Sequence, residues 1–93
     1  MLKTLEELIT IIRQRKESSA EESYTKKLLN DKKLSVEKVK EEIEELIDSI
    51  EKNSNKVHEA ADVLYHLMVL LEANDIKIED VMDELKKRQN DIR

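Results

Sequence analysis

The chain has 93 residues and contains no glycine, proline or cysteine. This composition excludes glycine-rich phosphate loops, disulfide bonds and thiolate metal sites. A net charge of -5 and an aromatic content of 2% also argue against a nucleic-acid-binding surface, which is usually basic. No signal peptide is visible and no apolar run approaches the ~20 residues that cross a bilayer. We therefore expect one cytoplasmic domain, residues 1–93, without a membrane or nucleic-acid partner.

Apolar residues recur with a helical period in four long segments. These predicted helices are residues 2–16, 36–52, 56–73 and about 78–90. After the first of them, Ser23 or Thr25 is predicted to cap a short turn of helix that ends at Leu29. A polar joint follows at residues 30–35, and its last residue, Ser35, is predicted to cap the next helix.

The predicted helix 56–73 is apolar over more than half of its circumference, whereas the other long helices carry one apolar stripe each. We expect this helix to be the central, buried element and the others to pack around it. The fold class is therefore all-α, a bundle of four to five helices. Because so short a chain buries little surface, we expect a second subunit to cover the remaining stripes, giving a homodimer or a dimer of dimers.

Polar side chains interrupt the apolar surface of this central helix near its start. Glu59, Asp62 and His66 form one narrow stripe on the helix. Two unpaired carboxylates cost roughly several kcal/mol each when they are buried. They therefore require a cation, which is either a basic side chain or a metal ion.

The preceding helix supplies a matching pair of acids. Glu42 and Glu45 have i, i+3 spacing, as do Glu59 and Asp62, so each pair lies on one face of its helix. Antiparallel packing of the two helices brings the pairs together. Four oxygen ligands suit a hard cation such as Mg²⁺ or Mn²⁺. A structural network of salt bridges remains the alternative at this stage.

Several motifs carry a resemblance to a known family. They are "EExxE" at residues 41–45, "ExxD" at 59–62, "SYTKKLL" at 23–29, "KVKEEIEE" at 38–45, "EAADVLYHLMVLL" at 59–71 and "IEDVMDELKKR" at 78–88. Together they resemble the MazG-like all-α nucleoside-triphosphate pyrophosphohydrolases, and within these the phosphoribosyl-ATP pyrophosphohydrolase family. The resemblance covers roughly residues 5–88 and implies a MazG-like bundle.

The resemblance also implies roles for individual residues. Glu42, Glu45, Glu59 and Asp62 correspond to the ligands of Mg²⁺, or of Mn²⁺, and Glu42 and Glu45 count with Glu41 as catalytic. Glu41 corresponds to a carboxylate that supports the metal ligands or orients water. Candidate substrate-binding residues are Arg15, Ser23, Tyr24, Thr25, Lys38 and His66.

The substrate candidates other than Arg15 also have a structural interpretation. Lys38 has the spacing of an i, i+4 pair with Glu42. Helix capping would explain Ser23 and Thr25, and covering the hydrophobic core would explain Tyr24. His66 is interpreted as a hydrogen-bonding support for the stripe that contains Asp62.

The implied reaction is metal-dependent hydrolysis of phosphoribosyl-ATP to phosphoribosyl-AMP and pyrophosphate, the second step of histidine biosynthesis. The first alternative is a house-cleaning (d)NTP pyrophosphohydrolase that uses the same metal site. The second is a non-catalytic helical dimerisation module whose acids form salt bridges between subunits.

Overall fold

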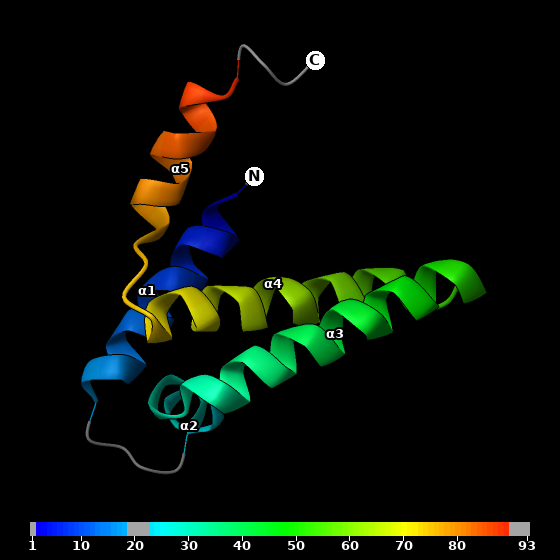
Figure 1. The fold of residues 1–93 in the computed structure, drawn as a ribbon, viewed down its shortest axis with the longest axis horizontal. Coiled ribbons are helices and arrows are strands. Elements are labelled where there is room, and N and C mark those ends of the chain that lie inside the picture. The colour runs from blue at the N-terminus through cyan, green and yellow to red at the C-terminus, as the bar shows by residue number, and fades with distance from the viewer. Residues whose placement is uncertain (1, 19–22, 90–93) are drawn as a thin grey trace.

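A computed structural model describes residues 2–18 and 23–89 of the chain. These residues form five α-helices and no strand, which confirms the all-α prediction (Figure 1). The helices are α1 (Lys3–Glu17), α2 (Tyr24–Asn30), α3 (Lys32–Lys52), α4 (Lys56–Ala73) and α5 (Ile78–Lys87). Within the described ranges, every helix is too short or too polar to cross a membrane.

The start of α3 differs from the prediction. Residues 30–35 were predicted to be a polar joint with Ser35 as the cap, but α3 begins at Lys32, and the Asp31 carboxylate accepts a hydrogen bond from the backbone N–H of Leu34 (3.0 Å). Ser35 lies inside the helix, is buried, and donates its hydroxyl hydrogen to the carbonyl of Leu28. Because the hydroxyl satisfies a carbonyl at the end of α2, the serine supports a tight α2–α3 junction instead of capping a helix.

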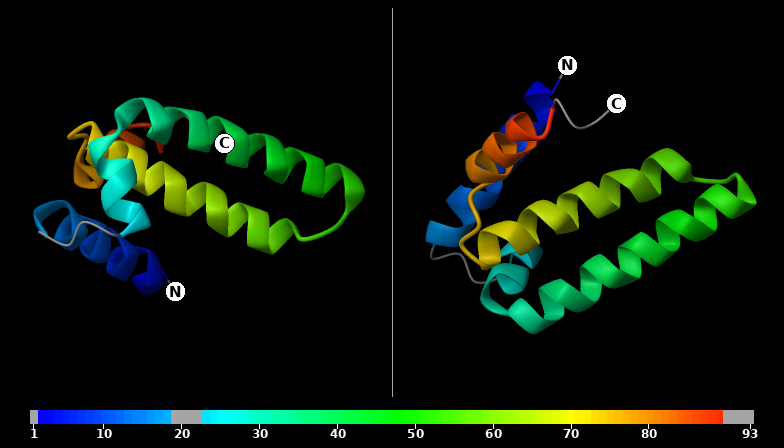
Figure 2. Two further views of the ribbon diagram at one scale, coloured as in Figure 1. Left: turned by 90° about the horizontal axis from the view of Figure 1, so that it is seen from below. Right: turned by 45° about the horizontal axis from the view of Figure 1, so that its top comes forward.

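A short loop joins α3 to α4 and makes them an antiparallel hairpin (Figure 2). Asn53 and Asn55 adopt left-handed backbone conformations on either side of Ser54, with φ of 55° and 58°. Asparagine tolerates this region better than other residues with a side chain, so the loop reverses the chain without glycine. The bounds of α4 are those predicted from the sequence.

The hydrophobic core lies around the second half of α4. Its buried residues come from α1, α2 and α4 and are Ile12, Leu28, Leu29, Met68, Val69 and Ala73. The first half of α4 pairs with α3, as the hairpin in Figure 2 shows. The helix predicted to be central is therefore enclosed over its second half, while its acidic first half lines the hairpin.

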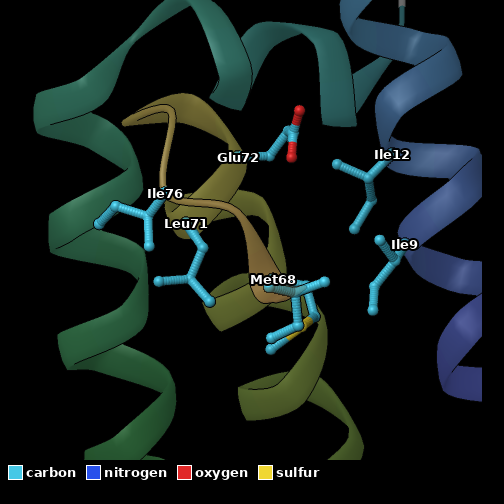
Figure 3. Close-up of a pocket in the computed structure, with 7 residues that line it drawn as sticks. Ile9, Ile12, Met68, Leu71, Glu72 and Ile76 are labelled. Atoms are coloured by element: carbon cyan, nitrogen blue, oxygen red, sulfur yellow. The ribbon is translucent and has the colours of Figure 1, made fainter. Parts of the chain in front are cut away.

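The last helix, α5, lies beside α1 at the end of the molecule away from the α3–α4 loop (Figure 1). It ends at Lys87, whereas the prediction extended it to about Asn90, which lies outside the described residues. Ile78 packs against the core, and with Ile76 it lines a small apolar pocket (Figure 3). Since no residue of α5 is buried, its attachment also depends on polar contacts with α1.

The main polar contact is a bidentate pair between Arg13 and Glu79. The two guanidinium nitrogens donate to the two carboxylate oxygens at 2.9 and 2.6 Å. Chiefly through these hydrogen bonds, Arg13 lowers the pKa of Glu79 from 4.5 to about 2. The stabilisation is therefore complete above pH ~4.5 and is lost as the pH falls toward 2.

We expect Glu79→Gln to lower the melting temperature at pH 6 but not at pH 2, where the wild-type carboxyl group is itself becoming protonated. Thermal unfolding of both proteins at the two pH values measures this difference. Glu84→Gln is the matched control, because the ion pair of Glu84 is with Arg88, the residue that follows α5, and not with a residue of α1. An equal difference in melting temperature between the wild-type protein and Glu79→Gln at both pH values would contradict a stabilising role for the ionised Glu79 carboxylate.

Candidate active site

The α3–α4 hairpin brings the predicted acids together from both helices. On α3, carboxylate oxygens of Glu41, Glu42 and Glu45 lie within 4.8 Å of one another. On α4, ligand atoms of His58, Glu59 and Asp62 do the same. The charge of Glu45 acts on Glu59, and the charge of Asp62 acts on Glu42. These effects between the helices indicate that the two groups face each other. The four acids predicted as metal ligands thus share one site.

Two of these acids are incompletely satisfied. Glu42 Oε2 and Glu59 Oε2 are buried, and neither has a hydrogen-bond partner among the residues that the structure describes. Burial raises the pKa of Glu42, and its contact with Glu45 raises it further. Burial also raises the pKa of Glu59, with the charges of Glu45 and Asp62 adding to the effect. The site therefore holds excess negative charge that a cation would relieve.

The described lysine and arginine side chains do not supply that cation. Within the described part of the chain, no lysine or arginine forms an ion pair with Glu42, Glu45, Glu59 or Asp62. The structural interpretation of Lys38 paired it with Glu42, but its Nζ lies 3.3 Å from Glu41 Oε2 instead. The pairing differs because Glu42 is directed toward α4, whereas Glu41 is exposed beside Lys38.

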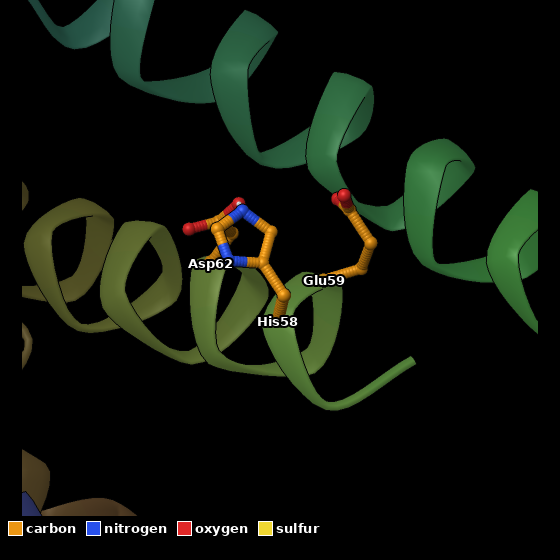
Figure 4. Close-up of side chains that lie close together, drawn as sticks. All are labelled: His58, Glu59 and Asp62. Carbon is orange, nitrogen blue, oxygen red and sulfur yellow. Dashed lines mark ion pairs between the residues drawn. The ribbon is translucent and has the colours of Figure 1, made fainter. Parts of the chain in front are cut away.

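His58 belongs to the site although the sequence interpretation did not include it. Its Nε2 lies 3.3 Å from Asp62 Oδ2, and its side chain is largely exposed. Figure 4 shows the imidazole over Asp62, while Glu59 points toward α3. The i, i+4 spacing of His58 and Asp62 was the signal that could have identified this contact.

The start of α2 lies against α4 one turn beyond Asp62. Tyr24 Oη is 3.0 Å from His66 Nε2, and Thr25 Oγ1 is hydrogen-bonded to the Tyr65 hydroxyl. His66 Nδ1 lies 2.9 Å from the backbone carbonyl of Asp62. His66 therefore supports the acidic stripe, as interpreted from the sequence, but its contact is with the Asp62 backbone and not with the carboxylate.

Two further substrate candidates are Ser23 and Arg15. Ser23 accepts a hydrogen bond from the backbone N–H of Lys26 (3.4 Å), which is the capping role. Arg15 is in the last turn of α1, where the neighbouring Lys16 contacts Glu72 near the end of α4. Glu72 is ten residues from Asp62, about 15 Å along the helix, so the structure does not bring Arg15 to the acids.

Comparison with known proteins finds similarity over nearly the whole chain. The profile described as Phosphoribosyl-ATP pyrophosphohydrolase matches residues 5–89. A histidine biosynthesis bifunctional protein HisIE from Pyrococcus furiosus is 44% identical over 90 residues, which cover 95% of this chain and 42% of that protein. The chloroplastic histidine biosynthesis bifunctional protein of Arabidopsis thaliana is also 44% identical over 95 residues, which cover 94% of this chain and 34% of that protein.

A relative of similar size is the phosphoribosyl-ATP pyrophosphatase of Clostridium novyi. It is 42% identical over 94 residues, which cover 95% of this chain and 83% of that protein. The chain therefore spans less than half of the two bifunctional proteins but most of the Clostridium protein.

Proposed function

This chain belongs to the phosphoribosyl-ATP pyrophosphohydrolase family, and we propose that it hydrolyses the α–β phosphoanhydride bond of phosphoribosyl-ATP. The products are phosphoribosyl-AMP and pyrophosphate. The observation that carries the proposal is a pair of buried oxygens, Glu42 Oε2 and Glu59 Oε2, that lie among the four acids and find no hydrogen-bond partner in the described part of the chain. A structural salt-bridge module would provide partners for both oxygens, whereas a metal-dependent hydrolase needs them free.

Glu42, Glu45, Glu59 and Asp62 are the residues that would hold Mg²⁺ or Mn²⁺. Their chemistry fits, because all four offer carboxylate oxygens and hard cations prefer oxygen ligands. Bound Mg²⁺ supplies neutralisation of the triphosphate charge in such a reaction. Lys38 adds a positive charge beside the site that can attract a phosphate group.

Glu41 is the residue proposed to orient the attacking water. It is exposed next to Glu42 and Glu45, and Lys38 Nζ lies 3.3 Å from its Oε2. A carboxylate in this position can accept a hydrogen bond from water and align its lone pair toward phosphorus.

The direct test is pyrophosphate release by the purified protein in the presence of Mg²⁺. Phosphoribosyl-ATP is assayed beside the common NTPs and dNTPs. Preferential hydrolysis of phosphoribosyl-ATP supports the proposal, while preference for a dNTP would favour the house-cleaning alternative. Pyrophosphate release from none of these nucleotides would favour the non-catalytic module.

We also propose that two copies of the chain associate through the exposed apolar face of the hairpin. The exposed apolar residues of the hairpin are Val36, Ile43, Ile47 and Ile50 on α3 and Val57 and Leu64 on α4. An apolar surface that runs along two neighbouring helices is typical of a contact between subunits. The dimer would bury residues that a single chain leaves in water.

Light scattering is expected to give a mass of at least twice 11.0 kDa at micromolar concentration. Ile47→Asp should shift this mass toward that of one chain, because a charge at the interface would be desolvated without a partner. Ile11→Asp is the matched control, since Ile11 is similarly exposed (47% against 50%) but lies on α1. A single-chain mass for the wild-type protein would refute the dimer.

A further inference from the structure

The first turn of α4 places an imidazole beside the cluster of acids. The Nε2 atom of His58 lies 3.3 Å from Asp62 Oδ2, and ligand atoms of His58, Glu59 and Asp62 all lie within 4.8 Å of one another. Donor atoms that share one cation through bonds of about 2.1 Å are themselves roughly 3 to 4 Å apart. The spacing of these three side chains is therefore close to that of groups that bind the same ion.

The helix itself holds the imidazole at this place. His58 and Asp62 are four residues apart in α4, so their side chains lie on one face, one turn from each other. Figure 4 shows the imidazole over Asp62, with Glu59 pointing toward α3. The side chain of His58 is 71% exposed, whereas one carboxylate oxygen of Glu59 is buried. His58 therefore borders the acids on the side that is open to solvent.

An imidazole nitrogen changes the cation that such a site prefers. The four acids offer only oxygens, and a set of oxygens suits Mg²⁺ and Mn²⁺. An imidazole suits the later first-row transition cations, and the affinity of a mixed nitrogen and oxygen site rises from Mn²⁺ to Co²⁺. Mg²⁺ gains little from the nitrogen, because it is a hard cation that keeps oxygen ligands.

We propose that His58 is a further ligand of the cation that the four acids hold, and that its nitrogen makes the site prefer a first-row transition cation to Mg²⁺. The inference deepens the proposed function, because it rests on the acids binding the cation of that reaction. His58 determines the specificity for the cation in this arrangement, whereas the acids supply the charge that binds any divalent ion.

Calorimetric titration of the metal-free protein with Mg²⁺ alone and with Co²⁺ alone measures this preference without a nucleotide. The wild-type protein is expected to bind Co²⁺ more tightly than Mg²⁺. Because losing a group that only supports a metal ligand costs roughly 10- to 100-fold in affinity, His58→Gln should reduce the ratio of the two affinities by about tenfold or more. Lys56→Gln, an exposed substitution in the same turn, should leave the ratio unchanged. Excess Mg²⁺ should displace Co²⁺, since both ions occupy one site.

Pulsed electron paramagnetic resonance on bound Mn²⁺ detects the nitrogen directly. Mn²⁺ accepts carboxylate ligands, so it should bind to the wild-type protein and to both histidine variants. A coupling between Mn²⁺ and a ring nitrogen is expected in the wild-type protein and in His66→Gln, and it should be absent from His58→Gln. Since the chain has only two histidines, this pair of variants assigns the coupling to one of them.

Four results would overturn the inference: no nitrogen coupling in the wild-type protein, a coupling that survives His58→Gln, Co²⁺ that excess Mg²⁺ does not displace, or a His58→Gln protein that loses affinity for Mg²⁺ and Co²⁺ by the same factor. The last result is the one expected if His58 only supports Asp62.

Pyrophosphate release from phosphoribosyl-ATP is scored separately, in Mg²⁺ and in Co²⁺. A protein that binds Co²⁺ through His58 but releases no pyrophosphate with either cation would contradict the proposed function and uphold the role of His58. A protein that releases pyrophosphate but shows no nitrogen coupling would contradict only the role of His58.

Discussion

Replacing Asp62 with asparagine is expected to reduce pyrophosphate release from phosphoribosyl-ATP by about a hundredfold or more while leaving the fold intact. Substitutions that only support metal ligands cost roughly 10- to 100-fold, so loss of a ligand charge should reach at least the upper end. The amide keeps the shape of the side chain but removes the charge that holds a hard cation. The lost contact with His58 is exposed and contributes little to stability.

Two measurements on Asp62→Asn separate the metal site from a salt-bridge module. Activity reports the ligand role, and the melting temperature reports the fold. In the module, neutralising an acid would strand a buried cation and destabilise the protein. Glu44→Gln and Glu51→Gln are controls, because both acids are exposed on α3 outside the cluster. An active Asp62→Asn protein, or one that is inactive because it has unfolded, would end the assignment of Asp62 as a ligand.

Helical periodicity was sufficient to predict the arrangement that creates the site. The long apolar pattern of residues 56–73 gave the bounds of α4, and the i, i+3 spacing of Glu59 and Asp62 placed them on one face. The short polar loop then required an antiparallel partner, which faces Glu42 and Glu45 toward them. Spacing within a helix and the shortness of one loop are local properties, so the sequence contains them directly.

Competition between neighbouring polar groups was not predictable in the same way. Asp31 and Ser35 are both suitable N-caps, and only the packing of α2 against α3 decides that Ser35 bonds to Leu28 inside the helix. Lys38 has acids at both i+3 and i+4, and the inward direction of Glu42 leaves Glu41 as its partner. These outcomes depend on tertiary contacts that no spacing encodes.

The contact between Tyr24 and His66 shows the same limit over a longer distance. The two residues are 42 positions apart, and their hydrogen bond exists because α2 packs across the middle of α4. The sequence marked both residues as candidates for substrate binding through the resemblance. That these two side chains contact each other could be learned only from the structure.

The stability of the protein is expected to depend strongly on the cation. A ligand at a hundred times its Kd stabilises the state that binds it by about 2.7 kcal/mol. For a domain of this size, each kcal/mol corresponds to roughly 4–8 °C in melting temperature. Excess Mg²⁺ should therefore raise the melting temperature on the order of 10 °C above its value in EDTA. Equal melting temperatures in Mg²⁺ and EDTA would argue against a preformed metal site.

Glu42→Gln should melt above the wild-type protein in one buffer and below it in the other. In EDTA the variant is expected to melt above the wild-type protein, because the substitution removes a buried charge that Glu45 and Asp62 repel. In excess Mg²⁺ it should melt below the wild-type protein, since a ligand charge is missing. Glu44→Gln, a substitution of the same kind on the exposed side of α3, should follow the wild-type protein in both buffers. The crossing of the two melting temperatures is the decisive result, because a substitution that only loosens packing lowers both values. A Glu42→Gln protein that melts below the wild-type protein even in EDTA would mean that the carboxylate has a stabilising partner, and the site would then be structural.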